Sequence, residues 1–163
     1  MFKKLSALLA VLVLVPSLAA CTPADNSTTA AGAAGTTTAA AAPAEMTRVK
    51  AEEAVPHIDE EGYKWIDLRK AADVEVSTVK NAVPADLSVV VEGKDMAAGE
   101  AAMKEAIGDF TGNLVLVCYT GNKYAQAATD VLTSMGYDMS KVVTLEDGFK
   151  GLEKSHPDVV VTK

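Results

Sequence analysis

A single cysteine at the end of an apolar run is the residue with the clearest chemical potential. Residues 115–117 are Val-Leu-Val and run into Cys118, which is followed by a short loop containing Gly121 and by helix-forming residues 124–132. A cysteine at such a turn lies near unpaired amides of the loop and the helix N-terminus, which favour the thiolate and can hold an anion. The pattern indicates a nucleophile, although a buried and inert cysteine could also end a strand.

The neighbouring sequence alternates short apolar runs with amphipathic ones. We expect strands at residues 47–49, 63–68, 114–117 and 142–145, with short extended pieces at 81–84 and 87–91. We expect helices at residues 50–58, 94–110, 124–135 and 149–153, a helix or loop at 70–75, and a strand or tail at 159–161. This alternation predicts one α/β domain at residues 46–163, with a central, mostly parallel sheet flanked by helices. Ligands of such sheets bind at the carboxyl ends of strands, where Cys118 is expected.

The beginning of the chain has the pattern of an export signal. Lys3 and Lys4 precede an apolar run at residues 5–15, which is too short for a permanent membrane span, and small residues follow. The Leu-Ala-Ala-Cys sequence ending at Cys21 resembles the bacterial lipobox. This resemblance implies that residues 1–20 are a lipoprotein signal peptide and that Cys21 is the lipidation site.

The segment that follows, residues 21–45, has almost no large apolar side chains. It consists mainly of Ala, Thr, Gly, Pro and Ser and cannot bury a core, so we expect a lipidated, disordered tether. The protein would then be exported and lipid-anchored to a bacterial membrane, facing the periplasm or the cell exterior. An uncleaved anchor, or an ordinary signal peptide with an incidental cysteine, also fits these residues.

Charge and cysteine content narrow the function classes. The full chain has 15 basic and 22 acidic residues, and removal of residues 1–20 takes away two lysines, which leaves 13 against 22 and a net charge of −9. This acidity argues against a nucleic-acid partner. If Cys21 is acylated, Cys118 is the only thiol left, so no intramolecular disulfide can form and the domain must rely on its core.

Three segments resemble those of a single-domain rhodanese. They are Ile66-Asp67-Leu68-Arg69, Cys118-Tyr119-Thr120-Gly121-Asn122-Lys123, and Val143-Thr144-Leu145-Glu146-Asp147-Gly148-Phe149. The sequence Cys-Tyr-x-Gly-Asn is especially similar to that of small bacterial thiosulfate sulfurtransferases. The resemblance covers residues 47–153 and implies a rhodanese-like three-layer α/β domain. We interpret Asp67 and Arg69 as structural residues that tie the strand end to neighbouring loops.

The resemblance implies a sulfur relay that needs no cofactor. Cys118 would attack a thiosulfate-like donor, hold the outer sulfur as a persulfide and pass it to a thiol or cyanide acceptor. Backbone amides of the following residues would cradle the persulfide, namely Tyr119, Thr120, Gly121, Asn122, Lys123 and Tyr124. Lys123 could add a positive charge for an anionic donor, or be a solvated lysine at the helix start. We expect the domain to be a monomer.

Several positions depart from the family pattern. Where the family usually has Gly-His-Ile-x-Gly-Ala, this chain has Ser77-Thr78-Val79-Lys80-Asn81-Ala82. Only Val79 and Ala82 keep the residue type of the family pattern, apolar at the isoleucine position and alanine at the last position. Asp147 replaces the first glycine of the Leu-Glu-Gly-Gly turn, and Leu152 replaces the usual tryptophan. The alternative function is therefore a catalytically weak rhodanese-like binding module, tethered to the membrane, with a vestigial cysteine.

Other chemistries lack a required residue. A cysteine phosphatase needs an arginine six residues after the cysteine, where Tyr124 stands. A thiol-disulfide oxidoreductase usually has a second cysteine where Gly121 stands, whereas exchange with a partner protein needs only one cysteine and stays open as an alternative. His57 and His156 are far apart and have no ligand cluster nearby, so no metal site is predicted.

Overall fold

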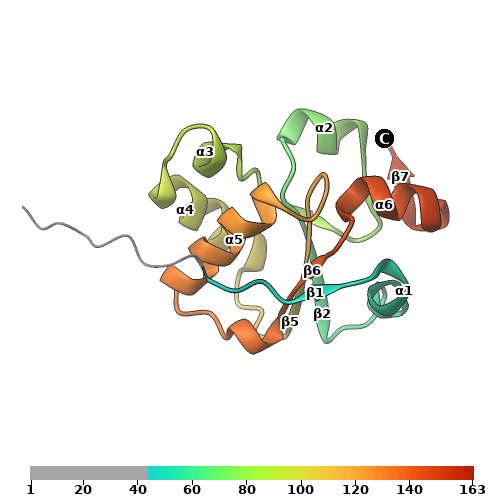
Figure 1. The fold of residues 1–163 in the computed structure, drawn as a ribbon, viewed down its shortest axis with the longest axis horizontal. Helices are drawn as coiled ribbons and strands as arrows, with labels where there is room; N and C mark the ends of the chain where they lie inside the picture. The colour runs from blue at the N-terminus through green and yellow to red at the C-terminus, as the bar shows by residue number, and fades with distance from the viewer. Residues whose placement is uncertain (1–43) are drawn as a thin grey trace, which may run out of the picture. The chain divides into compact units, whose positions relative to one another are not determined.

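Five parallel strands form the central sheet of the domain (Figure 1). The structure is a computed structural model that describes residues 44–163, so the expected signal peptide, the lipidation of Cys21 and nearly all of the tether lie outside the described residues. The strands lie in the order β1-β6-β5-β2-β4, and every pairing is parallel. Their bounds are β1 Arg48–Val49, β2 Tyr63–Asp67, β4 Val83–Pro84, β5 Asn113–Val117 and β6 Val142–Leu145. The predicted α/β fold with a mostly parallel sheet is confirmed.

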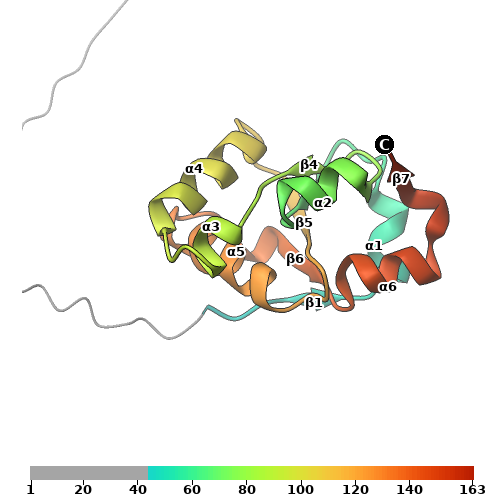
Figure 2. The same cartoon turned by 90° about the horizontal axis from the view of Figure 1, so that it is seen from above.

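Helices cover both faces of this sheet, as Figure 1 and Figure 2 show. Helices α3, α4 and α5 lie on one face, and α1 and α6 lie on the other. Their bounds are α1 Ala51–Ala54, α2 Ala71–Val76, α3 Ser88–Val91, α4 Met96–Ile107, α5 Lys123–Ser134 and α6 Gly148–Ser155, with short 3-10 turns at Val55–His57, Met139–Lys141 and Pro157–Val159. Parallel neighbours need such crossover connections because a tight turn cannot join them.

The central strand β5 supplies side chains to both hydrophobic cores. Successive side chains of a strand point to opposite faces of the sheet. Leu114 and Leu116 therefore pack in the core shared with α4 and α5, and Cys118 continues this alternation into the same core. Val115 and Val117 pack in the second core with residues of α1 and α6. The cysteine side chain thus lies on the α5 side of the sheet.

The expectation of an extended piece at residues 87–91 is wrong, because this segment contains helix α3. Its run of three valines favours a strand by intrinsic preference. Asp86 opposes that preference, since its carboxylate accepts a hydrogen bond from the Ser88 amide at 2.8 Å. Val90 and Val91 are then buried in the core with residues of α4 and α5. Tertiary packing outweighs the strand preference of the valines here.

Residues near the C-terminus form a second, two-stranded sheet. Strand β7 (Val160–Thr162) pairs antiparallel with β3 (Ser77–Val79). The apolar pattern of β7 is visible in the sequence, whereas β3 has no clear pattern and lies in the segment that departs from the family. Val79 is fully buried in the second core. The divergent segment is therefore a structural part of the domain.

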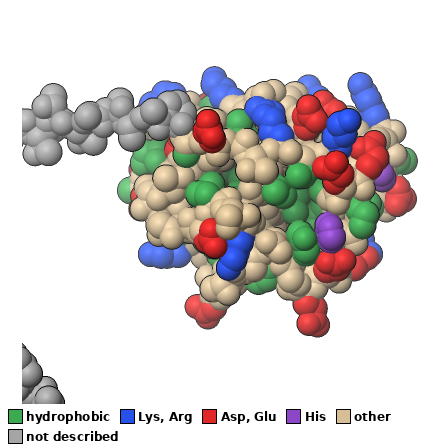
Figure 3. All heavy atoms as spheres, turned by 60° about the horizontal axis from the view of Figure 1, so that its bottom comes forward, with side chains coloured by type: hydrophobic (Ala, Val, Ile, Leu, Met, Phe, Trp, Pro, Cys, Tyr) green, Lys and Arg blue, Asp and Glu red, His purple; other side chains and the backbone are tan. Residues whose placement is uncertain are grey.

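The surface shows no dominant charge on the face drawn in Figure 3. Acidic and basic side chains are interspersed there, with hydrophobic side chains between them. A charged ligand would therefore meet individual side chains on that face instead of one extended field. Within residues 44–163, the helices are all too short or too polar to cross a membrane.

Trp65 lies in the second core with an unpaired indole N–H. Its side chain is 1% exposed, and Nε1 has no hydrogen-bond partner among the described residues. An unpaired buried donor costs about 1–3 kcal/mol, which would offset much of the packing lost on replacement by a smaller aromatic ring. We predict that Trp65→Phe lowers the free energy of unfolding by at most about 1 kcal/mol, whereas Trp65→Ala lowers it by about 3–5 kcal/mol. Urea denaturation measures both values, and equal losses would contradict the offset.

Candidate active site

Cys118 follows β5 at the carboxyl edge of the parallel sheet, where the sequence places it. Its side chain is 1% exposed, and it is the free cysteine of the described residues. The predicted site residues continue from it into the first turn of α5: Gly121 and Tyr124 are buried, Tyr119 is half-buried, and Thr120, Asn122 and Lys123 are exposed. The cysteine loop, defined as residues 118–122, therefore surrounds a buried thiol but also reaches solvent.

The cysteine loop packs its backbone directly against the turn between β6 and α6. Gly121 has a φ of +68° and Gly148 a φ of +59°, in a region that glycine adopts without steric cost. A Cβ on Gly121 would overlap the carbonyl oxygens of Leu145 and Glu146, and a Cβ on Gly148 would overlap the carbonyl oxygen of Cys118. Both positions thus need glycine for two separate reasons, the backbone conformation and the close approach.

The same turn tolerates Asp147 where the family usually has glycine. Asp147 has φ −97° and ψ 2°, a conformation open to residues with a side chain. The turn still supports the cysteine loop, because the Phe149 amide donates to the Cys118 carbonyl at 2.7 Å and the Lys150 amide donates to the Tyr119 carbonyl at 3.3 Å. This departure from the family pattern therefore leaves the loop support intact.

An arginine from the first strand holds the far end of the cysteine loop. Arg48 donates from Nη1 to the Gly121 carbonyl at 2.7 Å and from Nη2 to Asn122 Oδ1 at 3.1 Å. The Asn122 side chain in turn donates to the Thr120 carbonyl at 2.8 Å. The planar guanidinium suits this two-point attachment. Sequence reasoning missed Arg48, and its only signal was its place on a strand expected at the edge of the same sheet.

Asp67 and Arg69 are structural, as their position in the sequence suggested. Both side chains are buried, and Arg69 donates to the two carboxylate oxygens of Asp67 at 3.0 and 2.7 Å. Asp67 also accepts from Thr78 Oγ1 at 2.9 Å, and Arg69 donates to the Ser77 carbonyl at 2.6 Å. The guanidinium lies 3.5 Å from the ring centroid of Phe149. The buried charges are thus fully partnered, and they tie β2 to β3 and α6.

Two tyrosines connect the cysteine loop and the start of α5 to segments around α2 and α3. The Tyr119 hydroxyl donates to Asp73 and accepts from the Lys70 amide at 3.3 Å. The Tyr124 hydroxyl donates to Glu92 at 3.0 Å, and Lys70 forms an ion pair with Glu92 at 2.8 Å. The two tyrosine rings meet edge to face with centroids 5.3 Å apart. We call these five residues the tyrosine network.

The protonation states of the tyrosine network match its hydrogen bonds. Burial, followed by the bond to Glu92, raises the pKa of Tyr124 far above its ordinary value. Burial and then the bond to Asp73 raise the pKa of Tyr119. The hydrogen bond from Lys70, followed by that from Tyr124, lowers the pKa of Glu92. Near neutral pH both hydroxyls are therefore donors and Glu92 is a charged acceptor.

The two histidines lie apart from the cysteine loop. His57 contacts Glu60 at 2.9 Å and stacks on Tyr63 with ring centroids 4.2 Å apart. His156 contacts the adjacent Ser155 hydroxyl at 2.9 Å. Over residues 44–163, no three or more His, Cys, Asp or Glu side chains gather in a way that could hold a metal ion.

A parallel α/β sheet with a cysteine loop between its central strand and a helix is the architecture of rhodanese-like domains. The family model described as Rhodanese-like domain matches residues 50–155, which is more than half of the chain. The chain belongs to the rhodanese-like domain family. A comparison with curated proteins finds no match.

Several solved structures share this fold. A rhodanese-related protein from Thermoplasma volcanium is 21% identical, with a TM-score of 0.51 over 72% of this chain and 99% of that chain. The human single-domain sulfurtransferase is 19% identical, with a TM-score of 0.50 over 71% and 98%. A thiosulfate sulfurtransferase from Pseudomonas aeruginosa is 16% identical, with a TM-score of 0.51 over 68% of this chain and 19% of that chain. At these identities the likeness establishes the fold.

The tyrosine network should slow the reaction of the Cys118 thiol with an added reagent. Because the thiol is buried, a reagent must wait for the surrounding segments to open. Each hydrogen bond stabilises the closed arrangement by about 0.5–1.5 kcal/mol, so Tyr124→Phe and Glu92→Gln should each speed alkylation of Cys118 about two- to tenfold.

Mass mapping of the Cys118 peptide over time after iodoacetamide addition measures this rate. Lys80→Met is the matched control, because it removes a surface ion pair with Asp59 outside the network. Rates that stay equal in wild type and both network variants would contradict the prediction.

Proposed function

We propose that the chain is a sulfurtransferase that carries sulfane sulfur as a persulfide on Cys118. The observation that carries the proposal is the position of this thiol at the carboxyl end of the central strand, in a rhodanese-like domain. The backbone amides of residues 119–124 support it further, since they donate no hydrogen bond to any other group within residues 44–163. Such amides are available to a negative charge on the sulfur.

The proposed first step loads sulfur from an anionic donor such as thiosulfate. The Cys118 thiolate forms a bond to the outer sulfur of thiosulfate, and the bond between the two donor sulfurs breaks. The electron pair of that bond leaves with sulfite, and the transferred sulfur keeps its negative charge as the terminal sulfur of the new persulfide. The amides of the cysteine loop would stabilise this charge, and burial of the thiol would limit the access of water.

The proposed second step passes the terminal sulfur to an acceptor. A thiolate or cyanide forms a bond to that sulfur, and the bond to Cys118 Sγ breaks. The electron pair returns to Cys118 as a thiolate, and the acceptor leaves as a persulfide or thiocyanate. Lys123 is exposed at the start of α5, so its ammonium can attract anionic substrates to this side of the loop.

The alternative function is that of a binding module with an unused cysteine. Burial of the Cys118 thiol favours this alternative. Two features weigh for the enzyme. The loop-supporting glycines are both present, and the contacts of Asp67 with Arg69 and Thr78 preserve the support of the site despite the divergent residues 77–82. A pure binding module would not need to preserve a loop built around a thiol.

Intact-mass measurement tests the proposed persulfide. Treatment of the protein with thiosulfate should add the mass of one sulfur atom, and cyanide should remove it with formation of thiocyanate. Cys118→Ala should abolish the adduct, because no other sulfur nucleophile lies in the loop, whereas Cys21→Ser should retain it. Failure to load sulfur from either thiosulfate or an organic persulfide would favour the binding module.

We also propose that the protein is exported and anchored through lipid on Cys21, which rests on the sequence of residues 1–21. In a bacterial host, processing should be blocked by globomycin, and the processed protein should fractionate with membranes. Cys21→Ser should abolish lipid attachment and membrane retention of the processed form. Soluble export of both the wild type and this variant would overturn the proposed anchor.

A further inference from the structure

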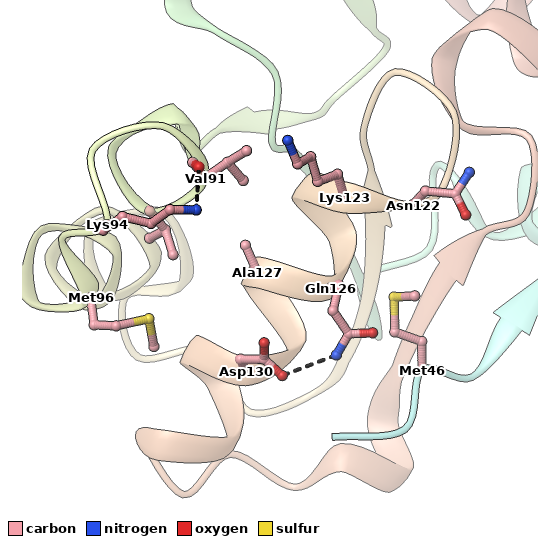
Figure 4. Close-up of a pocket in the computed structure, with 10 residues that line it drawn as sticks. Met46, Val91, Lys94, Met96, Asn122, Lys123, Gln126, Ala127 and Asp130 are labelled. Atoms are coloured by element: carbon pink, nitrogen blue, oxygen red, sulfur yellow. Dashed lines mark hydrogen bonds between the residues drawn. The ribbon is translucent and has the colours of Figure 1, made fainter. Parts of the chain in front are cut away.

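A groove of about 580 Å³ lies beside the cysteine loop, between α3, the start of α4 and α5. Figure 4 shows Ala127 of α5 between Met96 on one side and Met46 on the other. Val91 of α3 forms part of the wall. The groove adjoins the cysteine loop through Asn122, which contributes to both. Its size is that of a small-molecule site, and its lining is mainly apolar with a few polar groups.

The lining is suited to an apolar chain more than to an inorganic anion. Met96 is 39% exposed and is one of the few large hydrophobic side chains of the described residues that face solvent to this extent. Methionine side chains adapt to ligands of varied shape, and one lies at each end of the groove. Thiosulfate and cyanide have no apolar part, so neither would use this lining.

Charge complementarity favours an anionic head group. Lys123 forms no ion pair within residues 44–163, and its side chain extends from the start of α5 toward the α3 side of the groove (Figure 4). Lys94 donates to the Val91 carbonyl at 2.9 Å, which leaves other donors of its ammonium group. Asp130 also lines the groove and keeps its negative charge, and its carboxylate accepts hydrogen bonds from Gln126 at 3.0 Å and from the Ala44 amide at 3.2 Å, so the anionic head group is placed at the lysines and away from it. The groove therefore offers two cationic groups on an otherwise acidic protein.

The backbone of Lys94 supports a specific placement of its side chain. Lys94 has a φ of +59°, a conformation in which glycine is preferred and lysine is strained. The preceding residue is Gly93, so the chain places a lysine, and not the neighbouring glycine, in this conformation. From there the ammonium group reaches back to α3 and lines the groove.

We propose that this groove binds a small organic anion with a single apolar chain, of the medium-chain carboxylate or alkyl sulfonate class. The head group lies between Lys94 and Lys123, and the chain lies over Ala127, in the part of the groove between Met96 and Met46. The proposal does not depend on sulfur transfer, since the ligand needs no reactive sulfur. Its head group would lie next to the end of the cysteine loop.

Methionine methyl NMR tests the groove, because the chain has informative methionines inside and outside it. The full chain, labelled with ¹³C at the methionine methyls and held in lipid nanodiscs, is titrated with octanoate. The signals of Met46 and Met96 should shift in a saturable manner. Met103, which is fully buried in the core and does not line the groove, should keep its signal. Octylammonium, which has the same tail and the opposite charge, should leave all three signals unchanged.

Two variants and a matched control complete the test. Ala127→Leu fills the groove, and Lys94→Glu reverses the charge of a side chain proposed to contact the head group. Each variant should therefore weaken octanoate binding at least tenfold. Lys150→Glu removes a lysine on the other side of the cysteine loop and should bind octanoate as the wild type does. An unchanged Met103 signal reports an intact core in each variant. The proposal is overturned if Met46 and Met96 do not shift, if octylammonium shifts them equally, or if Lys94→Glu binds as tightly as Lys150→Glu.

Discussion

The close approach of two backbone segments is the constraint on which the site depends. The cysteine loop can lie against the β6–α6 turn only because Gly121 and Gly148 have no side chains and adopt positive φ. The approach brings the carbonyl of Cys118 to the first amides of α6, where it is hydrogen-bonded. These main-chain contacts do not depend on the side chain at position 147. They therefore explain how Asp147 can replace a glycine of the family pattern while the cysteine loop stays in place.

Much of this arrangement can be predicted from the sequence because its determinants are local. The apolar run of β5 predicts a central strand, and the cysteine that ends it must lie at the carboxyl edge of a parallel sheet. The glycines at 121 and 148 mark positions with unusual backbone requirements. Residues whose role depends on burial or backbone conformation leave a clear pattern in one sequence.

Contacts between distant segments could not be predicted in the same way. Arg48 reaches a carbonyl 73 residues away, and Glu92 pairs with a tyrosine 32 residues away. Nothing in the local sequence distinguishes these charged residues from solvated ones, because their role depends on how the chain folds back. The helical state of residues 88–91 was missed for a related reason, since its valines favour a strand until α4 and α5 pack against them. Tertiary context decides all three cases.

The contact between Arg48 and the cysteine loop has a practical consequence for handling the domain. Arg48 stands only a few residues after the first described residue, Ala44, whose carbonyl accepts a hydrogen bond from Gln126 of α5. The start of the domain is therefore hydrogen-bonded to the cysteine loop through Arg48 and to α5 through Ala44. A fragment cut just before the first helix, at residue 50, would match the family boundary yet lack the strand that secures the loop. Domain boundaries drawn from family matching alone would thus separate the cysteine loop from its own support.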